Sequence, residues 1–347
     1  NDAVWYSAAF NPPPLAYYDL MDGIFIPTVA NSGAAYLNLN GMGPLQVLRY
    51  DGTPVRAGDL IAYAPIPLVK WGSNWWCLRA VPSQFPQSIW DGRIFWVRSD
   101  GNDATGDGSE NTPSRAFATL EGAYVYLYTR FYPNGRMPTI RIGLAGTYTG
   151  LSHNRWPGPL NVDSINPASM NSFVITGEPG GAQWTMNCGR NCELNLNGLQ
   201  LNATGQPGAV AARCFNGYMT IQNCDVRGAG SGSMCFGCEA NGLMFLLDNN
   251  RTRNNANYGM RVSAGGRLWV QGTLTLQNTP NYGTVFASVE TGALLDNHGG
   301  GDTVYGSGTG KRYSVTGNGM IMARGVGVGW LPGNIAGSED GYGHYFP

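Results

Sequence analysis

The sequence predicts an all-β protein organised around a parallel β-helix. Apolar strand-like segments recur in the middle of the chain at steps of 21 to 25 residues, and a period in this range indicates a solenoid. Each segment alternates apolar and polar residues and ends in Asn, Gly and other turn formers, as half-buried strands do. The long amphipathic runs of helical repeats and the leucine-rich repeat signature are missing. The aligned apolar positions are Ile175, Leu196, Ile221, Phe245, Val270 and Leu294.

The composition narrows the class of protein. Gly makes up 51 of 347 residues, charged residues 12% and hydrophobic residues 43%, which describes a turn-rich chain with enough apolar side chains for a core. A net charge of −1 without a Lys/Arg cluster argues against a nucleic-acid partner. No run approaches about 18 consecutive apolar residues, so membrane insertion is not expected. The first residues lack the layout of a signal peptide, although the missing initiator Met leaves a removed leader open.

Residues 1–92 contain short β patterns broken by proline clusters. The clusters are PPP at Pro12 to Pro14 and PIP at Pro65 to Pro67, and proline belongs at strand edges and turns. We therefore expect a small N-terminal β module that is separate from the β-helix.

One helix is predicted, over Ser114–Phe131, with Pro113 near its start. Such a helix can cover the open first rung of a β-helix, whose strand edges would otherwise be free to pair with other chains. The residues on its apolar face are Phe117, Leu120, Ala123, Tyr124 and Leu127.

The loop before this helix, Asp100 to Glu110, is rich in oxygen ligands. It superficially resembles a calcium loop, yet the twelve-residue pattern with a terminal Glu is missing, so a Gly-rich capping turn is favoured. The oxygen-bearing residues are Asp100, Asn102, Asp103, Asp107 and Glu110.

The β-helix is expected over residues 93–296. After Asn297 the sequence becomes very Gly-rich, as in HGGGDTVYGSGTG. This change predicts a separate C-terminal β cap or an intertwined tip over residues 297–347.

Three segments resemble bacteriophage tail fibre and tail spike proteins. The first is a module with an NTGA-type turn, a strand ending in NGLG, an AGDL turn and an apolar strand, in that order. The segment Ile94 to Leu127 resembles the start of the right-handed β-helix in these proteins, and WLPGNIAGSEDGYGHYF resembles fibre C-termini. The matches to the N-terminal module are Asn31 to Ala34, Asn40 to Gly43, Ala57 to Leu60 and Leu68 to Leu78.

The resemblance implies a homotrimer in the virion, at the phage tail, assembled in the host cytoplasm and acting extracellularly. Its partners would be a baseplate or tail protein and a bacterial surface glycan or protein receptor. A non-enzymatic or weakly enzymatic fibre is favoured, with a polysaccharide depolymerase, either a hydrolase or a lyase, as the alternative. No motif indicates a cofactor or a metal, since His153, His298 and His344 are scattered without HExxH or HxH.

Aromatic residues are the first candidates for glycan binding. The chain has 10 Trp, 18 Tyr and 12 Phe, and large rings are favoured at interfaces and as surfaces on which sugars stack. Trp156 lies beside His153 in the loop LSHNRWPGPL, which lacks a strand pattern. We therefore expect an exposed ring there, and a buried loop anchor is the alternative.

Charged residues on the rungs are the second candidates. A 24-residue step stacks Asp225 on Asn249, Arg227 on Arg251 and Cys224 on Asp248, which makes Asp225 and Asp248 diagonal neighbours. Glycosidases use two carboxyl groups about 5 to 10 Å apart, so this pair is the catalytic candidate. An anion-binding patch for acidic sugars and a solvated face with weak salt bridges stay open. Glu178 and Glu193 are weaker candidates without a predicted partner.

Seven cysteines are unusual for such a fibre. Cys188, Cys214 and Cys238 are 26 and 24 residues apart, so they are expected to stack on equivalent rung positions as small buried thiols. Disulfides and a thiolate metal site remain alternatives, since Cys192 and Cys235 complete CxxxC and CxxC spacings. The odd number leaves at least one thiol free or paired between chains.

Overall fold

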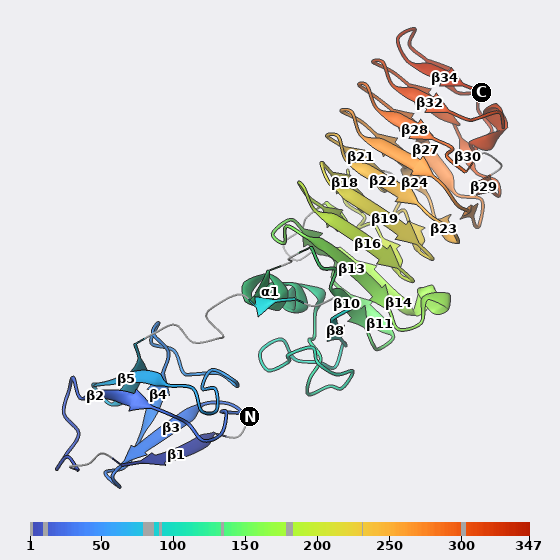
Figure 1. The fold of residues 1–347 in the computed structure, drawn as a ribbon. Helices are drawn as coiled ribbons and strands as arrows, with labels where there is room; N and C mark the ends of the chain where they lie inside the picture. The colour runs from blue at the N-terminus through green and yellow to red at the C-terminus, as the bar shows by residue number, and fades with distance from the viewer. Residues whose placement is uncertain are drawn as a thin grey trace. The chain divides into compact units, whose positions relative to one another are not determined.

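The computed structural model describes residues 3–9, 13–78, 87–89, 92–132, 135–177, 183–230, 232–299 and 303–347. The chain divides into two compact units, Asn1–Ser88 with Thr129–Tyr132 (unit 1) and Ile89–Tyr128 with Pro133–Pro347 (unit 2) (Figure 1). Pro12 and Glu178, which were singled out above, lie outside the described residues. No helix in these ranges is long and apolar enough to cross a membrane.

Unit 1 contains a six-stranded sheet with the order β1-β3-β4-β6-β5-β2. Its core is formed by inward side chains such as Leu37, Leu68 and Trp75, each at most 3% exposed. A pocket of about 290 Å³ lies between the two edge strands. The strands are β1 (Val4–Ala8), β2 (Asp22–Phe25), β3 (Ala35–Leu39), β4 (Pro44–Leu48), β5 (Ile66–Trp71) and β6 (Asn74–Cys77), and a further parallel pair joins β7 (Gln87–Ser88) to β9 (Phe131–Tyr132).

Unit 2 is a parallel β-helix with three sheets, which we call sheets 1, 2 and 3; Figure 1 shows their strands stacked rung upon rung. Sheet 1 comprises β8 (Ile94–Val97), β10 (Thr139–Ile142), β13 (Pro159–Ser164), β16 (Glu193–Asn197), β19 (Tyr218–Gln222), β22 (Leu243–Leu246), β25 (Arg267–Val270), β28 (Leu294–Asp296), β32 (Met320–Met322) and β34 (His344–Phe346). Sheet 2 comprises β11 (Gly146–Tyr148), β14 (Phe173–Thr176), β17 (Gln200–Asn202), β20 (Asp225–Arg227), β23 (Asn250–Arg253), β26 (Leu274–Leu276) and β29 (Val304–Tyr305). Sheet 3 comprises β12 (Leu151–His153), β15 (Trp184–Cys188), β18 (Val210–Phe215), β21 (Met234–Glu239), β24 (Ala256–Val262), β27 (Asn281–Val289), β30 (Thr309–Gly310), β31 (Tyr313–Val315) and β33 (Ser338–Glu339). Two short 3-10 helices, η2 (Pro167–Ser172) and η3 (Val328–Trp330), lie in the connections.

The predicted period is confirmed on sheet 1. Leu196, Ile221, Leu246 and Val270 lie in register at steps of 25, 25 and 24 residues, and each is at most 1% exposed. Each rung therefore covers the apolar side chains of the next, as a solenoid requires. Two aligned positions were wrong. Phe245 is one residue out of register and faces outward, since LMFLL is an apolar run that hides the alternation, and Ile175 belongs to sheet 2.

Left-handed turns join sheet 1 to sheet 2. Gly198, Asn223 and Asn249 occupy equivalent turn positions with φ of 73°, 51° and 59°, a conformation that glycine and asparagine tolerate best. The asparagine side chains also stack, because Asn249 Nδ2 donates to Asn223 Oδ1 at 3.0 Å. These contacts explain the Asn-Gly and Asn-rich endings of the repeats.

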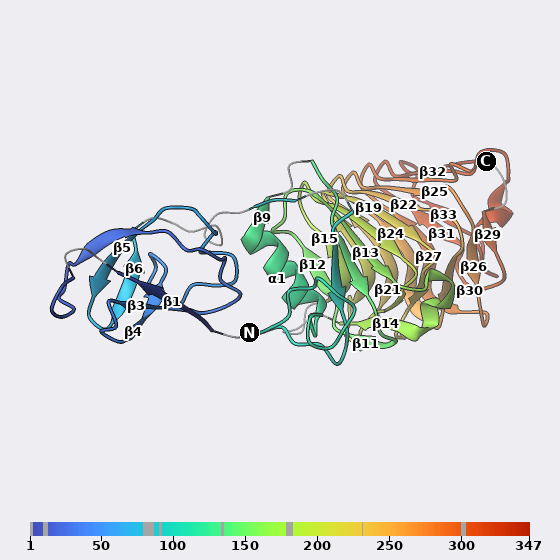
Figure 2. The ribbon, with the colours of Figure 1, turned by 60° about the horizontal axis from the view of Figure 1, so that its bottom comes forward.

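The helix is shorter than predicted: α1 spans Leu120–Arg130. It begins there because the Thr119 hydroxyl accepts the Gly122 N–H at 2.9 Å and Asp103 Oδ1 accepts the Ala118 and Thr119 N–H groups, which caps the free donors of the first turn. The five residues of the predicted face are all buried, although Phe117 precedes the helix. Figure 2 shows α1 at the end of the stacked rungs.

The C-terminal region continues the coil. We predicted a separate cap over residues 297–347, but β32 and β34 extend sheet 1, and β31 and β33 extend sheet 3. Trp330 in η3 is 2% exposed, and its Nε1–H donates to the Thr303 hydroxyl at 2.9 Å. The glycine-rich stretches are thus turns between further rungs.

Candidate functional site

Asp225 lies at the centre of a charged cluster on the outward face of sheet 2. Val226, beside it on β20, is fully buried and faces the core, so Asp225 and Arg227 face outward. Asp225 Oδ2 accepts from Arg227 Nε at 3.1 Å and Nη2 at 2.7 Å, and from Arg253 Nε at 2.7 Å. These two guanidinium groups cover the carboxylate so completely that Asp225 has no exposed surface.

The predicted stacking of this cluster was wrong by two residues. Asp225 is in register with Arg251, and Arg227 with Arg253. Asp248 instead lies exposed in the turn before β23, where its carbonyl accepts the Asn223 N–H at 3.1 Å. The predicted pairing of Asp225 with Asp248 is therefore not formed.

This geometry does not suit Asp225 as a catalytic acid. A general acid must hold a proton and reach the substrate, whereas two arginines stabilise the ionised form of Asp225 and exclude solvent from it. Glu193, the other described candidate, lies half-buried on β16 in register with Tyr218.

Trp156 anchors its loop and does not present an exposed ring, as we had expected. The side chain is 1% exposed, its Nε1–H donates to the Pro159 carbonyl at 3.3 Å, and its backbone N–H donates to the Tyr124 hydroxyl at 2.9 Å. The loop therefore folds around a tyrosine of α1, which the sequence pattern of the loop alone could not show.

His153 is also buried and cannot contact a ligand directly. Its Nε2 lies 3.2 Å from the Gly158 carbonyl and its Nδ1 lies 3.2 Å from the Tyr124 hydroxyl. Because a carbonyl can only accept, Nε2 carries the proton and Nδ1 accepts from Tyr124. Burial lowers the pKa of His153 from its ordinary 6.5 to about 4, so the ring is neutral in the folded protein.

We expect His153 to make stability fall with acid. Between pH 6.5 and about 4 the unfolded chain binds a proton at this histidine and the folded chain does not, so the free energy of unfolding drops by about 3 kcal/mol across this window. Urea unfolding at pH 7 and pH 4.5 measures the change, and His153→Gln, which does not titrate, should remove most of it. An equal pH dependence in the variant would contradict the prediction.

An aromatic stripe on the outward face of sheet 1 was not predicted. Tyr218 packs against Phe245 with ring centroids 5.2 Å apart, Phe245 against Trp269 at 4.8 Å, and Trp269 stacks on His298 at 4.9 Å. Tyr218 is 36% exposed, and the His298 side chain is 41% exposed. These four residues, the aromatic stripe, offer sugar-sized ring surfaces at both ends of a rigid row.

Polar side chains continue the stripe in both directions. Asp296, in register with Trp269, accepts from Arg324 Nε and Nη2 at 2.6 Å each and lies 3.7 Å from His298 Nδ1. On the other side the Thr220 hydroxyl donates to Asn195 Oδ1, and Asn195 Nδ2 donates to Asn161 Oδ1 at 3.1 Å. Rings flanked by fixed donors and acceptors are the arrangement expected for a glycan-binding surface.

The cysteine ladder is present on sheet 3. Cys188, Cys214 and Cys238 lie in register on adjacent rungs, and all three are fully buried. The pKa values of the Cys188 and Cys238 thiols are raised by hydrogen bonding to Cys214 and by burial. Cys192 and Cys235 are buried as well, with burial raising the pKa of each to about 11. All seven cysteines are free thiols in the structure, which supports the core-filling interpretation.

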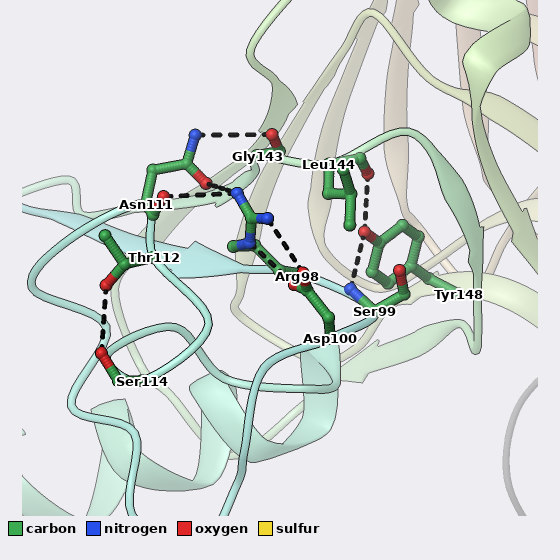
Figure 3. Close-up of polar contacts among 9 residues, drawn as sticks. All are labelled: Arg98, Ser99, Asp100, Asn111, Thr112, Ser114, Gly143, Leu144 and Tyr148. Carbon is green, nitrogen blue, oxygen red and sulfur yellow. Dashed lines mark hydrogen bonds and ion pairs between the residues drawn. The ribbon is translucent and has the colours of Figure 1, made fainter.

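The acidic loop before α1 is organised by its own donors (Figure 3). Arg98 holds Asp100 through Nε at 2.8 Å and Nη2 at 3.0 Å, and its Nη1 donates to Asn111 Oδ1 at 3.1 Å. The Tyr148 hydroxyl accepts the Ser99 N–H and donates to the Leu144 carbonyl. These contacts support a capping turn, and no group of three or more His, Cys, Asp or Glu in the described ranges is placed to hold a metal ion.

These features define a parallel β-helix protein with polar and aromatic outward faces. No protein-family model and no curated protein matches the chain. Among solved structures, the chain is similar to the pectin methylesterase from Aspergillus niger, in its deglycosylated form and in its penultimately deglycosylated form. Each match has 12% sequence identity and a TM-score of 0.38, and covers 74% of this chain and 89% of that chain.

Proposed function

We propose that the protein is a homotrimeric phage tail fibre that binds a bacterial surface glycan along the outward face of sheet 1. The aromatic stripe is the observation that carries the glycan part of this proposal. The tail role rests on the sequence resemblances in residues 23–78, 94–127 and 330–346. The partners in this proposal are two further copies of the chain, a phage tail protein and the host glycan.

Binding fits the described faces better than bond cleavage does. A retaining or inverting glycosidase needs one carboxylic acid and one carboxylate facing the same bond. The outward carboxylates on the strands are instead held by arginines, which keeps them ionised. The pairs are Arg141 with Asp163, Arg213 with Glu239, Arg227 and Arg253 with Asp225, and Arg324 with Asp296.

The stripe can be tested with two exposed rings whose removal leaves the core intact. We expect Tyr218→Ala combined with His298→Ala to weaken binding to extracted host polysaccharide by about tenfold or more, because each ring loses a stacked sugar. Tyr342→Ala is the matched control, since Tyr342 is 72% exposed but lies in the turn before β34, outside the stripe.

Size-exclusion chromatography of the polysaccharide with the protein supplies the measurement. Co-elution without a change in polysaccharide size, reduced in the double variant and retained in the control, supports the proposal. A progressive fall in polysaccharide size would identify a depolymerase instead, and co-elution that the double variant keeps would remove the stripe from the binding surface.

A further inference from the structure

Three arginines gather on the outward face of sheet 2, where one buried carboxylate balances them incompletely. Arg227 and Arg253 pair with Asp225, and Arg251 lies in register with Asp225 on the adjacent strand. We call these arginines the basic cluster. With Asp225 they carry a formal charge of +2. The other residues in register on this face, Gln200 and Thr275, are neutral.

Two arginines of the cluster are fixed in place. Asn171 Oδ1, from η2, accepts from Arg253 Nη2 at 2.7 Å and from Arg227 Nη2 at 3.3 Å. Each guanidinium thus bonds both to Asp225 and to Asn171 and is already ordered before any ligand binds. Asp225 therefore acts as an organiser of positive charge, and a ligand that binds here meets little cost of ordering these side chains.

Arg251 is the member of the cluster that remains available. Its side chain is half-buried on β23 and makes no hydrogen bond or ion pair with any described residue. Asp225 Oδ1 likewise has no donor among the described residues, so Arg251 does not bond to the carboxylate beside which it lies. Its five N–H donors are left for solvent or for a ligand.

The ligand that fits is a carboxylate with further oxygens nearby. A planar guanidinium donates two parallel hydrogen bonds to a carboxylate, and the outward arginines of one strand, two residues apart, are about 7 Å from each other, which is comparable to the width of a sugar ring. We propose that the basic cluster binds the carboxylate of an acidic sugar in an anionic bacterial polysaccharide. This inference rests on the proposed function, and it names the class of glycan that the protein recognises.

The test compares native polysaccharides with their carboxyl-reduced forms. On an array of bacterial surface polysaccharides that contain uronic acids, the protein should bind the native forms about tenfold more tightly than the reduced forms, and Arg251→Gln should abolish this preference. Arg115→Gln is the matched control, because it removes the same charge from a half-exposed side chain that pairs with Asp107 in the loop before α1.

The outcomes separate this inference from the proposed function. If the protein binds native and reduced glycans equally and Arg251→Gln changes nothing, the basic cluster is not the site, although glycan binding stands. If no polysaccharide binds, the proposed function fails. Titration with methyl glucuronoside, followed by the arginine Nε–Hε NMR signals, then decides the cluster alone. A saturable shift that methyl glucoside does not cause supports the inference, and no shift overturns it.

Discussion

Replacing Asp225 with asparagine is expected to lower the free energy of unfolding of unit 2 by about 4 kcal/mol. The carboxylate is fully buried, and its Oδ2 accepts from both Arg227 and Arg253. Asparagine has the same shape but no charge, so two partly buried guanidinium groups would lose the anion that compensates them. Removing one partner of a buried ion pair costs about 3 to 5 kcal/mol, since the remaining charge stays desolvated.

The measurement is urea unfolding of the full chain, with Asp248→Asn as the matched control. Asp248 is exposed in the turn that precedes β23, and a change of this kind on the surface costs about 0.5 kcal/mol or less. Equal effects of the two substitutions would contradict the account of Asp225 as the buried centre of the cluster. A small effect of Asp225→Asn together with lost polysaccharide cleavage would instead restore a catalytic role for this residue.

The difference between these two aspartates also shows why the register could not be predicted from the sequence. The period comes from inward positions, and these are apolar on every rung, which made the coil predictable. Two residues separate Ile221 from Asn223, but three separate Leu246 from Asn249. The extra residue lies in the turn, so it leaves the apolar period of sheet 1 nearly unchanged while it shifts sheet 2.

That one-residue insertion decides which residues meet. It brings Arg251 beside Asp225 and leaves Asp248 exposed in the turn. The stacked side chains of Asn223 and Asn249 mark the true equivalence, and aligning the asparagines of the turns would have found it. The cysteine ladder was predicted correctly because Cys188, Cys214 and Cys238 lie on one sheet whose strands pair without a shift.

The aromatic stripe was missed because its members come from an apolar run and from two different contexts. Phe245 lies within LMFLL, where an outward ring is indistinguishable by pattern from an inward one. His298 follows β28 in a turn, and nothing in its sequence context indicates that it stacks on Trp269. Tyr218 and Trp269, in contrast, sit on strands whose alternation places them outward, and this signal was available.

Trp156→Ala is expected to lower the free energy of unfolding by about 4 kcal/mol while leaving glycan binding by the folded protein unchanged. Removing a buried aromatic ring leaves a cavity, and such substitutions cost about 3 to 5 kcal/mol. The ring is 1% exposed and closes the loop around the Tyr124 hydroxyl, which also accepts the Arg155 N–H at 2.8 Å. Loss of the ring would therefore loosen the contact between this loop and α1.

Thermal and urea unfolding with Tyr342→Ala as control separate the two roles that a tryptophan in this loop could have. Tyr342 is 72% exposed, so its removal should cost about 0.5 kcal/mol or less. A sugar-stacking tryptophan would show the opposite pattern, namely a small change in stability and a large loss of polysaccharide affinity. Because Trp156 packs on the helix that covers the first rung, we expect its loss to expose the edge of sheet 1 there, so the variant should also associate through that edge as unfolding begins.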